Sequence, residues 1–289
     1  MITLKNNSLE ITISNDGAQI VDIHNHSTKF LHDANPKYWS RVSPVLFPIV
    51  GKLAKDTYLH NNKEYTLSSH GFARDMKFEL INNTDTSATF ELNSNEETLS
   101  KYPFEFKLQI SYELINNEVF VKWNVFNTST TDTMYFSIGA HPAFLLNNTS
   151  IDNFSLEFKN SKSIESYEFN NDTGQVFENK VLVHNSSTLP LSNELFVKHP
   201  VLILDNESEI TLKQNNSTYN VTTKFDNFPL VGIWTPMIDG SCAPFVCIEP
   251  WYGVADSKDE PQEISQKRAI QKLQPNSKFS SVYSMTFNS

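Results

Sequence analysis

The feature that most constrains this 289-residue chain is the alternation of apolar and polar residues in short segments that end in turn residues. The first example is "SLEITIS", followed by the turn "NDG" and then "AQIVDIH", where Gly17 supplies the positive φ that such turns need. The same pairing recurs at 77–93 and, around Asn116 and Asn117, at 105–127. A period of two places alternate side chains on opposite faces of a strand, so these segments predict an antiparallel meander.

Strand-like segments continue to the end of the chain, and the best helix pattern, "EPQEISQKRAIQKLQP" at 260–275, follows the 3.6-residue period only in part. We expect a turn or two there at most. No repeat, low-complexity tract or linker divides the chain. The sequence therefore predicts an all-β protein, a large antiparallel β-sandwich in which 1–289 form a single domain.

The formal net charge is −10, and no cluster of Lys and Arg offsets it locally, so nucleic acid is not expected as a partner. No segment has the length and apolar character of a membrane span, and the N-terminus does not resemble a signal peptide. We therefore expect a cytoplasmic protein with no membrane partner. The sequence carries no signal for an oligomeric state.

Four stretches interrupt the alternation with polar residues beside Gly or Pro: 41–53, 68–75, 138–144 and 247–256. In an all-β protein such interruptions mark strand ends, loops or bulges, where binding and catalytic groups are commonly placed. These four stretches therefore supply the candidate site residues.

His141 lies in "SIGAHPAF", where Gly139 permits unusual backbone angles and Pro142 biases the residue before it towards an extended conformation. The imidazole is therefore expected to be held in place. The alternative is a histidine packed at a strand end with both ring nitrogens satisfied.

Glu249 follows the apolar run "FVCI", so we expect it at the end of a buried strand, where desolvation raises the pKa of a carboxyl group. Such a carboxylate can serve as a base. The alternative is a structural carboxylate that pairs with an arginine or caps a turn. Trp251, two residues further, offers a flat apolar face to a ligand, with core packing as the alternative.

His70 and Arg74 in "HGFARD" are spaced so that both can project into one cleft, although a loop histidine beside glycine is often merely solvated. Arg41 and Lys52 flank the apolar segment "SPVLFPIVG". Either can be an ordinary solvated charge.

No nucleotide-binding or metalloprotease motif occurs, and the one close histidine pair, His24 and His26, lies in an expected hairpin strand. Cys242 and Cys247 are too few for a disulfide framework and lack the spacing of a zinc site. Two histidines and a glutamate therefore indicate proton transfer without a cofactor, and no metal is expected.

Five stretches, in this order, resemble the aldose 1-epimerase (galactose mutarotase-like) family, and its LacX-type branch in particular: "SPVLFPIVGKL", "HGFARD", "IGAHPAF", "FPLVGIWTP" and "CIEPWYGVAD". Each is weak alone, but the ordered set covers nearly the whole chain. The resemblance implies a β-supersandwich with a sugar-binding cleft on an open face, and an enzyme that interconverts the α and β anomers of a hexose.

The resemblance also implies roles for individual residues. His141 matches the histidine that protonates the sugar ring oxygen, and Glu249 matches the carboxylate that takes the proton from the C1 hydroxyl. His70 matches a histidine that binds sugar hydroxyls, and Asp205 lies near the position of a sugar-binding carboxylate. Apart from the resemblance, the place of Trp251 two residues after Glu249 favours contact with the sugar ring over core packing.

Lys52 occupies a position where family members carry arginine, which would replace a bidentate contact by a point charge. Arg41 and Arg74 resemble arginines that hold phosphate in a sugar-phosphate branch, but Ser69 stands where that branch tends to have glutamine. Two alternatives therefore remain beside a free-hexose mutarotase: a hexose 6-phosphate mutarotase, and a non-catalytic sugar-binding protein of the same fold.

Overall fold

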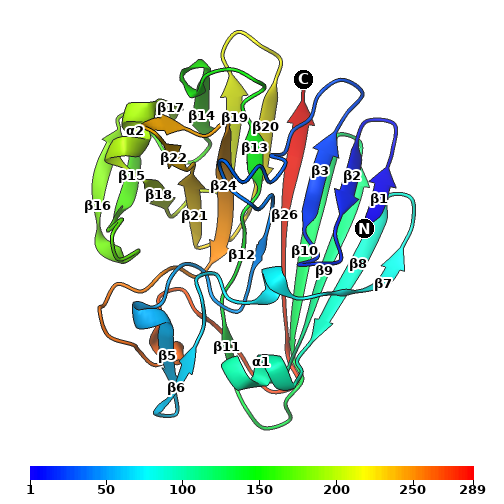
Figure 1. The fold of residues 1–289 in the computed structure, drawn as a ribbon, viewed down its shortest axis with the longest axis vertical. Helices are drawn as coiled ribbons and strands as arrows, with labels where there is room; N and C mark the ends of the chain where they lie inside the picture. Colours follow the sequence, from blue (N-terminus) through cyan, green and yellow to red (C-terminus); the bar gives the residue numbers. More distant parts are fainter.

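Two large antiparallel sheets form the body of the molecule in the computed structural model, which describes residues 1–289 (Figure 1). The larger sheet has nine strands, in the order β17 (Thr188–Pro190), β14 (Phe154–Phe158), β19 (Glu209–Gln214), β20 (Asn220–Lys224), β26 (Lys278–Asn288), β10 (Glu118–Asn127), β9 (Phe106–Ile115), β8 (Ser87–Asn93) and β7 (Glu79–Asn83). The smaller sheet has six: β18 (Val201–Leu204), β21 (Leu230–Trp234), β24 (Phe245–Tyr252), β12 (Ile138–Ala140), β4 (Val45–Leu46) and β13 (Ala143–Leu145), which pairs with β24. The predicted antiparallel sandwich is confirmed.

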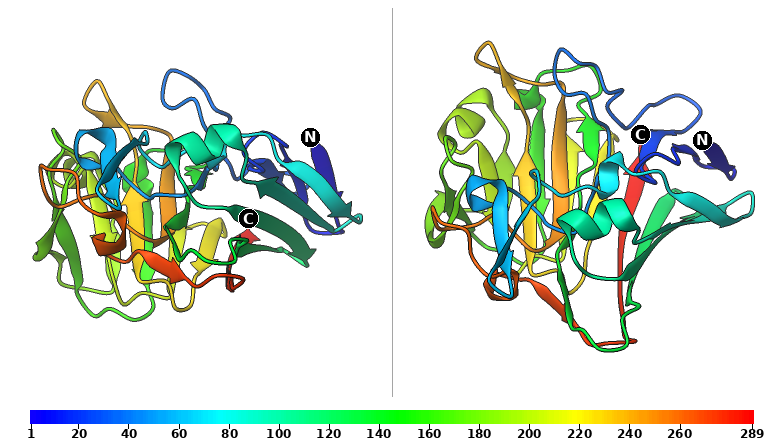
Figure 2. Two further views of the ribbon diagram at one scale, coloured as in Figure 1. Left: turned by 90° about the horizontal axis from the view of Figure 1, so that it is seen from below. Right: turned by 60° about the horizontal axis from the view of Figure 1, so that its bottom comes forward.

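Smaller sheets flank these two layers. A three-stranded sheet contains β1 (Ile2–Lys5), β2 (Glu10–Ile13) and β3 (Ile20–His24), and the two-stranded sheets are β5 (Thr57–His60) with β6 (Lys63–Thr66), β11 (Met134–Phe136) with β25 (Gln271–Leu273), β15 (Ile164–Phe169) with β16 (Val176–His184), and β22 (Met237–Ile238) with β23 (Ser241–Cys242). Figure 2 shows the β1–β3 sheet beside β7 and β8, on the side of the molecule opposite the β15–β16 hairpin.

The predicted hairpins form. β2 pairs with β3 after the turn at Gly17, whose φ of 71° is in the left-handed region, and β9 pairs with β10 after a turn at Asn116. Along β10, buried and less buried side chains alternate, as the period of two requires. The local pattern therefore determines which face of each strand is apolar.

The core lies between the two large sheets as one cluster of 64 buried residues. Phe144 of β13 packs against Phe287 of β26 with ring centroids 6.3 Å apart, which joins the smaller sheet to the larger. Apolar burial of this extent is the main favourable term in the stability of the fold.

Strand β24 is buried on both faces along almost its whole length. Alternation directs Val246 and Ile248 into the main core, whereas Cys247, Glu249 and Trp251 project from the opposite face. The second face is the one on which the candidate site is built.

Helices are few and short: α1 (Glu96–Lys101), α2 (Asn193–Lys198) and the 3₁₀ turns Ala54–Asp56, Ala73–Asp75, Ile151–Asn153 and Ile264–Gln266. The segment 260–275 contains one 3₁₀ turn, as expected, and also the strand β25, which was not expected. The helices α1 and α2 were not expected, and each begins at a side-chain cap, Asn95 and Ser192 respectively. None of the helices has the length and apolarity needed to cross a membrane.

Candidate active site

A cleft of about 340 Å³ on the outer face of the smaller sheet brings together six of the eight predicted site residues: His141, Glu249, His70, Arg74, Lys52 and Trp251. Its size falls at the small end of the range for small-molecule sites, about 300–1,000 Å³. A larger groove of about 650 Å³ beside β15 and β16 contains none of the eight. The chemistry is therefore concentrated in the smaller cleft.

His141 lies on the short connection between β12 and β13, and aromatic rings hold its imidazole on several sides. The Trp39 ring stacks on it with centroids 4.7 Å apart, Trp234 meets it edge-on at 5.4 Å, and His70 approaches at 5.6 Å. The prediction of a held imidazole is confirmed by this packing.

Glu249 lies inside β24 and not at its end, because the strand continues through Pro250 to Tyr252 by pairing with β21. This corrects the expected position by a few residues, while the expected burial is found, since only 1% of Glu249 is exposed. Gly232 of β21 stands directly opposite Glu249 in the register.

Trp251 covers two glycines on the strands that flank β24. A Cβ at Gly232 would lie 2.3 Å from the Trp251 ring, and one at Gly139 would lie 2.7 Å from it. Gly139 has no left-handed φ, so its role is to leave space and not to permit unusual backbone angles, which corrects the sequence-based interpretation. The indole thereby packs flat on the sheet and also lines the cleft.

The two central groups face each other: Nε2 of His141 lies 3.2 Å from Oε2 of Glu249. The alignment does not make a hydrogen bond, so Oε2 of Glu249 is buried without a partner. The other ring nitrogen of His141, Nδ1, is also buried without one. The cleft-lining Trp251 Nε1 and Arg74 Nε are likewise unpaired. Buried polar atoms are normally satisfied, so four unpaired atoms around one cleft indicate a binding site for a polar ligand.

Burial shifts the pKa values of His141 and Glu249 in opposite directions. It holds the pKa of His141 well below the usual imidazole value, with the neighbouring His70 and the two nearby arginines adding to the effect. It also raises the pKa of Glu249 well above the usual carboxyl value, against the opposing effect of the Trp251 indole. The pair therefore retains one proton between its two members over a wide pH range.

The tautomer of His70 follows from its contacts. The backbone N–H of Gly51 donates to Nδ1 of His70 over 3.2 Å, so the proton of the neutral ring is on Nε2. Burial, together with Arg74 and Arg41, lowers the pKa of His70 to about 3. His70 is thus a neutral ring that presents a hydrogen-bond donor.

The three predicted cations differ in whether they line the cleft and in whether they already have a bonding partner. Arg74 lines the cleft and donates from Nη2 to the carbonyl of Ser69 over 2.6 Å, while Arg41 forms an ion pair with Asp75 at 2.8 Å and does not line the cleft. Lys52 lines the cleft without an ion pair, and its exposed side chain runs past Gly174.

Asp205 also lies outside the set of cleft-lining residues. It follows β18, on the same face as the cleft-lining Ile203 by alternation, and accepts hydrogen bonds from the Tyr167 hydroxyl and the Lys180 ammonium, both at 2.6 Å. The side-chain amide of Asn206 also donates to it, over 2.9 Å, so the Asp205 carboxylate already has three partners.

Several lining residues were not identified from the sequence, notably Trp39, Trp234, Phe169 and Val176. Trp234 lies within the quoted stretch "FPLVGIWTP", so that motif contained a signal. The sequence around Trp39, "KYWSR", contained no such signal, because the contact of Trp39 with His141 depends on how the 32–44 segment crosses the sheet.

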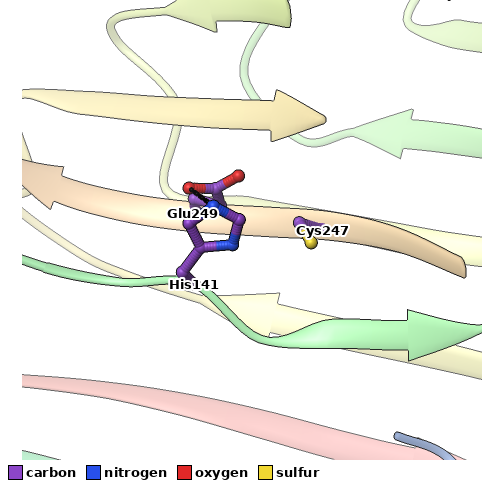
Figure 3. A group of neighbouring side chains, drawn as sticks. All are labelled: His141, Cys247 and Glu249. Atoms are coloured by element: carbon purple, nitrogen blue, oxygen red, sulfur yellow. Dashed lines mark ion pairs between the residues drawn. The ribbon is translucent and has the colours of Figure 1, made fainter. Parts of the chain in front are cut away.

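His141, Cys247 and Glu249 also form a group whose potential metal-ligating atoms all lie within 4.8 Å of one another (Figure 3). Cys247 is two residues before Glu249 on β24 and therefore on the same face. This group was not identified from the sequence, because His141 comes from a different stretch of the chain than Cys247 and Glu249.

The comparison with protein families identifies the chain: the family model described as "Aldose 1-epimerase" matches residues 1–272. The chain belongs to the aldose 1-epimerase family. Protein LacX of Lactococcus lactis subsp. lactis, in its plasmid and chromosomal forms, is 30% identical to this aldose 1-epimerase family member over 287 residues, with 95% of each chain covered.

Two solved structures have the same fold over essentially the whole length. A galactose mutarotase related enzyme from Lactobacillus acidophilus is 34% identical, with a TM-score of 0.93 and coverage of 100% of this chain and 97% of that one. A galactose mutarotase-like protein from Lactobacillus casei is 27% identical, also with a TM-score of 0.93, and 99% of each chain is covered. The resemblance predicted from the five stretches is confirmed.

Proposed function

We propose that this chain is an aldose 1-epimerase that interconverts the α and β anomers of a hexose such as galactose or glucose by acid–base opening of the ring. The observation that carries the proposal is the His141–Glu249 pair, whose facing atoms are 3.2 Å apart, in a small cleft that both residues line. Each residue is buried and has one polar atom without a hydrogen-bond partner. Family membership supports carbohydrate epimerase chemistry.

Opening a cyclic hemiacetal requires two proton transfers at one carbon. Glu249 accepts the proton of the C1 hydroxyl as that oxygen becomes a carbonyl, and protonated His141 donates to the ring oxygen as the C1–O bond breaks. Rotation about the C1–C2 bond presents the other face of the aldehyde, and the two transfers then run in reverse. Both oxygens are bonded to C1, so an acid and a base that nearly touch can serve them together.

The proton count explains how two buried groups can do this without solvent. In the free protein the opposite pKa shifts place the shared proton on Glu249 and leave both groups neutral. Opening starts from the form in which this proton has moved to His141, so that the carboxylate is ionised and the imidazole protonated, and it leaves both groups neutral again. One proton is present on the pair in both states, as the opposite pKa shifts favour. General acid and base catalysis contribute about 10²- to 10⁴-fold each when so placed.

The remaining residues act on binding. The neutral His70 donates from Nε2 to a sugar hydroxyl, Trp251 offers its ring face and its unpaired N–H, and Lys52 and Arg74 bind hydroxyl oxygens from the rim. Asp205 contributes at the margin of the cleft by holding the side chains of Tyr167 and Lys180 in place. No cofactor enters this scheme, and we assign residues 1–289 to a single domain, in accord with the one main core cluster.

A hexose 6-phosphate is the second candidate substrate, because Arg74 lines the cleft with its Nε unpaired and Arg41 lies nearby. Against it, Asp75 already pairs with Arg41 at 2.8 Å and lies 3.7 Å from Arg74, so the two cations share one carboxylate. A non-catalytic sugar-binding protein is the third reading.

The test is mutarotation of freshly dissolved anomers, followed by polarimetry or NMR with several hexoses and their 6-phosphates. The proposal requires a rate proportional to protein concentration and above that of the buffer. A protein that binds hexose yet never exceeds the buffer rate is a binding module, and the proposal is then wrong.

A further inference from the structure

Three buried side chains beside the cleft form a group of metal-ligating atoms, which proton transfer to and from the sugar does not require. Cys247, Glu249 and His141 place a sulfur, a carboxylate oxygen and a ring nitrogen within 4.8 Å of one another, and all three residues are buried. Figure 3 shows the imidazole meeting the carboxylate over β24, with the Cys247 side chain next to them on the same strand. Ala143 pairs with Cys247 in the β13–β24 ladder, which brings His141, two residues earlier, alongside.

These donors are the set that a d¹⁰ dication prefers. Zn²⁺ binds Cys sulfur at about 2.3 Å and His nitrogen and carboxylate oxygen at about 2.0–2.2 Å, in tetrahedral geometry, and sites with three protein ligands leave a fourth position open. Ligand atoms arranged in this way lie within about 4 Å of one another, so the separations here need only a small contraction. Mg²⁺, which takes oxygen ligands in an octahedral arrangement, fits poorly.

The charge balance favours the same ion. A thiolate and a carboxylate together carry two negative charges, which is costly in a buried site, and one divalent cation neutralises both.

We infer that His141, Cys247 and Glu249 form an inhibitory Zn²⁺ site, open to the cleft, in which two protons leave to solvent as the metal binds, one from the thiol and the one shared by the His141–Glu249 pair. The ion reaches the imidazole and carboxylate through the cleft that both residues line, whereas Cys247, next to them on β24, does not line it. It occupies both proton-transfer groups at once, so sugar turnover stops while the metal is bound. The inhibition rests on the proposed function; the metal binding does not.

Two measurements test the site on the full-length protein without chelating thiols. Titration with Co²⁺, a spectroscopic substitute for Zn²⁺, is expected to produce a thiolate-to-metal charge-transfer band, and Zn²⁺ is expected to inhibit mutarotation at micromolar concentrations, whereas Mg²⁺ does not. Cys247→Ala is expected to keep its basal mutarotation rate, to lose the band and to need at least about 100-fold more Zn²⁺ for half inhibition, since loss of an outer partner alone costs about 10- to 100-fold.

Cys242→Ala is the matched control. Cys242 is the other cysteine, half-buried, with its Sγ 3.3 Å from the Met237 sulfur, and its removal is expected to change neither measurement. If Cys247→Ala does not fold, Cys247→Ser, which keeps the side-chain volume but is a poor zinc ligand, replaces it. Absence of the Co²⁺ band in the wild-type protein, or equal Zn²⁺ inhibition of wild type and the Cys247 variant, overturns the inference. A protein that shows the band but no mutarotation retains the metal site and refutes the proposed function instead.

Discussion

Replacement of Lys267 by methionine tests how much a buried ion pair stabilises the part of the cleft wall next to Lys52. The Lys267 ammonium contacts Oδ1 of Asp256, and both residues are buried, at 4% and 2% exposure. Asp256 also accepts from the Ala54 N–H over 3.0 Å, and its own N–H donates to the carbonyl of Lys52 over 3.0 Å. Asp256, which follows β24, is therefore bonded both to the loop of Lys52 and Ala54 and to Lys267.

Lys267→Met leaves the Asp256 carboxylate buried without a cation, and removal of one partner of such a pair costs about 3–5 kcal/mol. At about 2 °C per kcal/mol for a chain of this size, the expected fall in Tm is about 6–10 °C. Adding Asp256→Asn removes the uncompensated charge, so the double variant is expected to recover part of the loss. We also expect a raised KM for hexose, with a smaller change in kcat, because the wall binds substrate and does not transfer protons.

The assay is urea or thermal unfolding of the two single variants and the double variant, together with mutarotation kinetics. Lys55→Met is the control, because the nearby Lys55–Glu260 pair, 2.6 Å apart, is 60% and 74% exposed and is expected to contribute less than about 1 kcal/mol. If Lys267→Met destabilises no more than Lys55→Met, or if the two changes at the buried pair are simply additive, the reasoning is refuted.

Three further predictions concern the reaction itself. The pair needs one proton: below its lower pKa it takes up a second and loses the base, and above its upper pKa it loses the acid. Because burial lowers the pKa of His141 from 6.5 and raises that of Glu249 from 4.5, kcat/KM is expected to stay level through pH 6.5, and an acid limb centred there would contradict the shifts. Exhaustive chelation is expected to leave activity intact, and a loss on EDTA that one divalent ion restores would contradict metal-free proton transfer. Free hexose is expected to be turned over at least as well as its 6-phosphate, since Asp75 already serves both nearby arginines; a large preference for the phosphate in kcat/KM would reverse this choice.

The architecture was predictable because period-two alternation records burial directly. In β2, β9 and β10 most of the apolar positions that alternate in the sequence are the ones buried in the structure, and turn residues such as Gly17 and Asn116 mark the reversals. The small helices were not predicted because each is only one or two turns long, which is too short to show a 3.6-residue period. A capping residue such as Asn95 was their only local signal.

The central pair was also predictable, since His141 and Glu249 each interrupt an apolar segment beside Gly or Pro. Their neighbours were not, because contacts across strands depend on register. Gly139 illustrates the difference: the sequence suggested backbone freedom, whereas the structure shows that the residue makes room for Trp251 on the paired strand. Trp39 stacks on His141 from a segment with no distinguishing pattern.

Glu249→Gln measures the central claim most directly. Glutamine keeps the size and an acceptor oxygen but removes the base, so mutarotation is expected to fall by about 10²-fold or more while hexose affinity changes far less. His141→Asn is expected to act likewise by removing the acid. The matched control is Glu207→Gln, a buried carboxylate held by Ser161 and Asn160 outside the cleft, which is expected to leave kcat unchanged. Full activity of Glu249→Gln would place the base elsewhere and contradict the account.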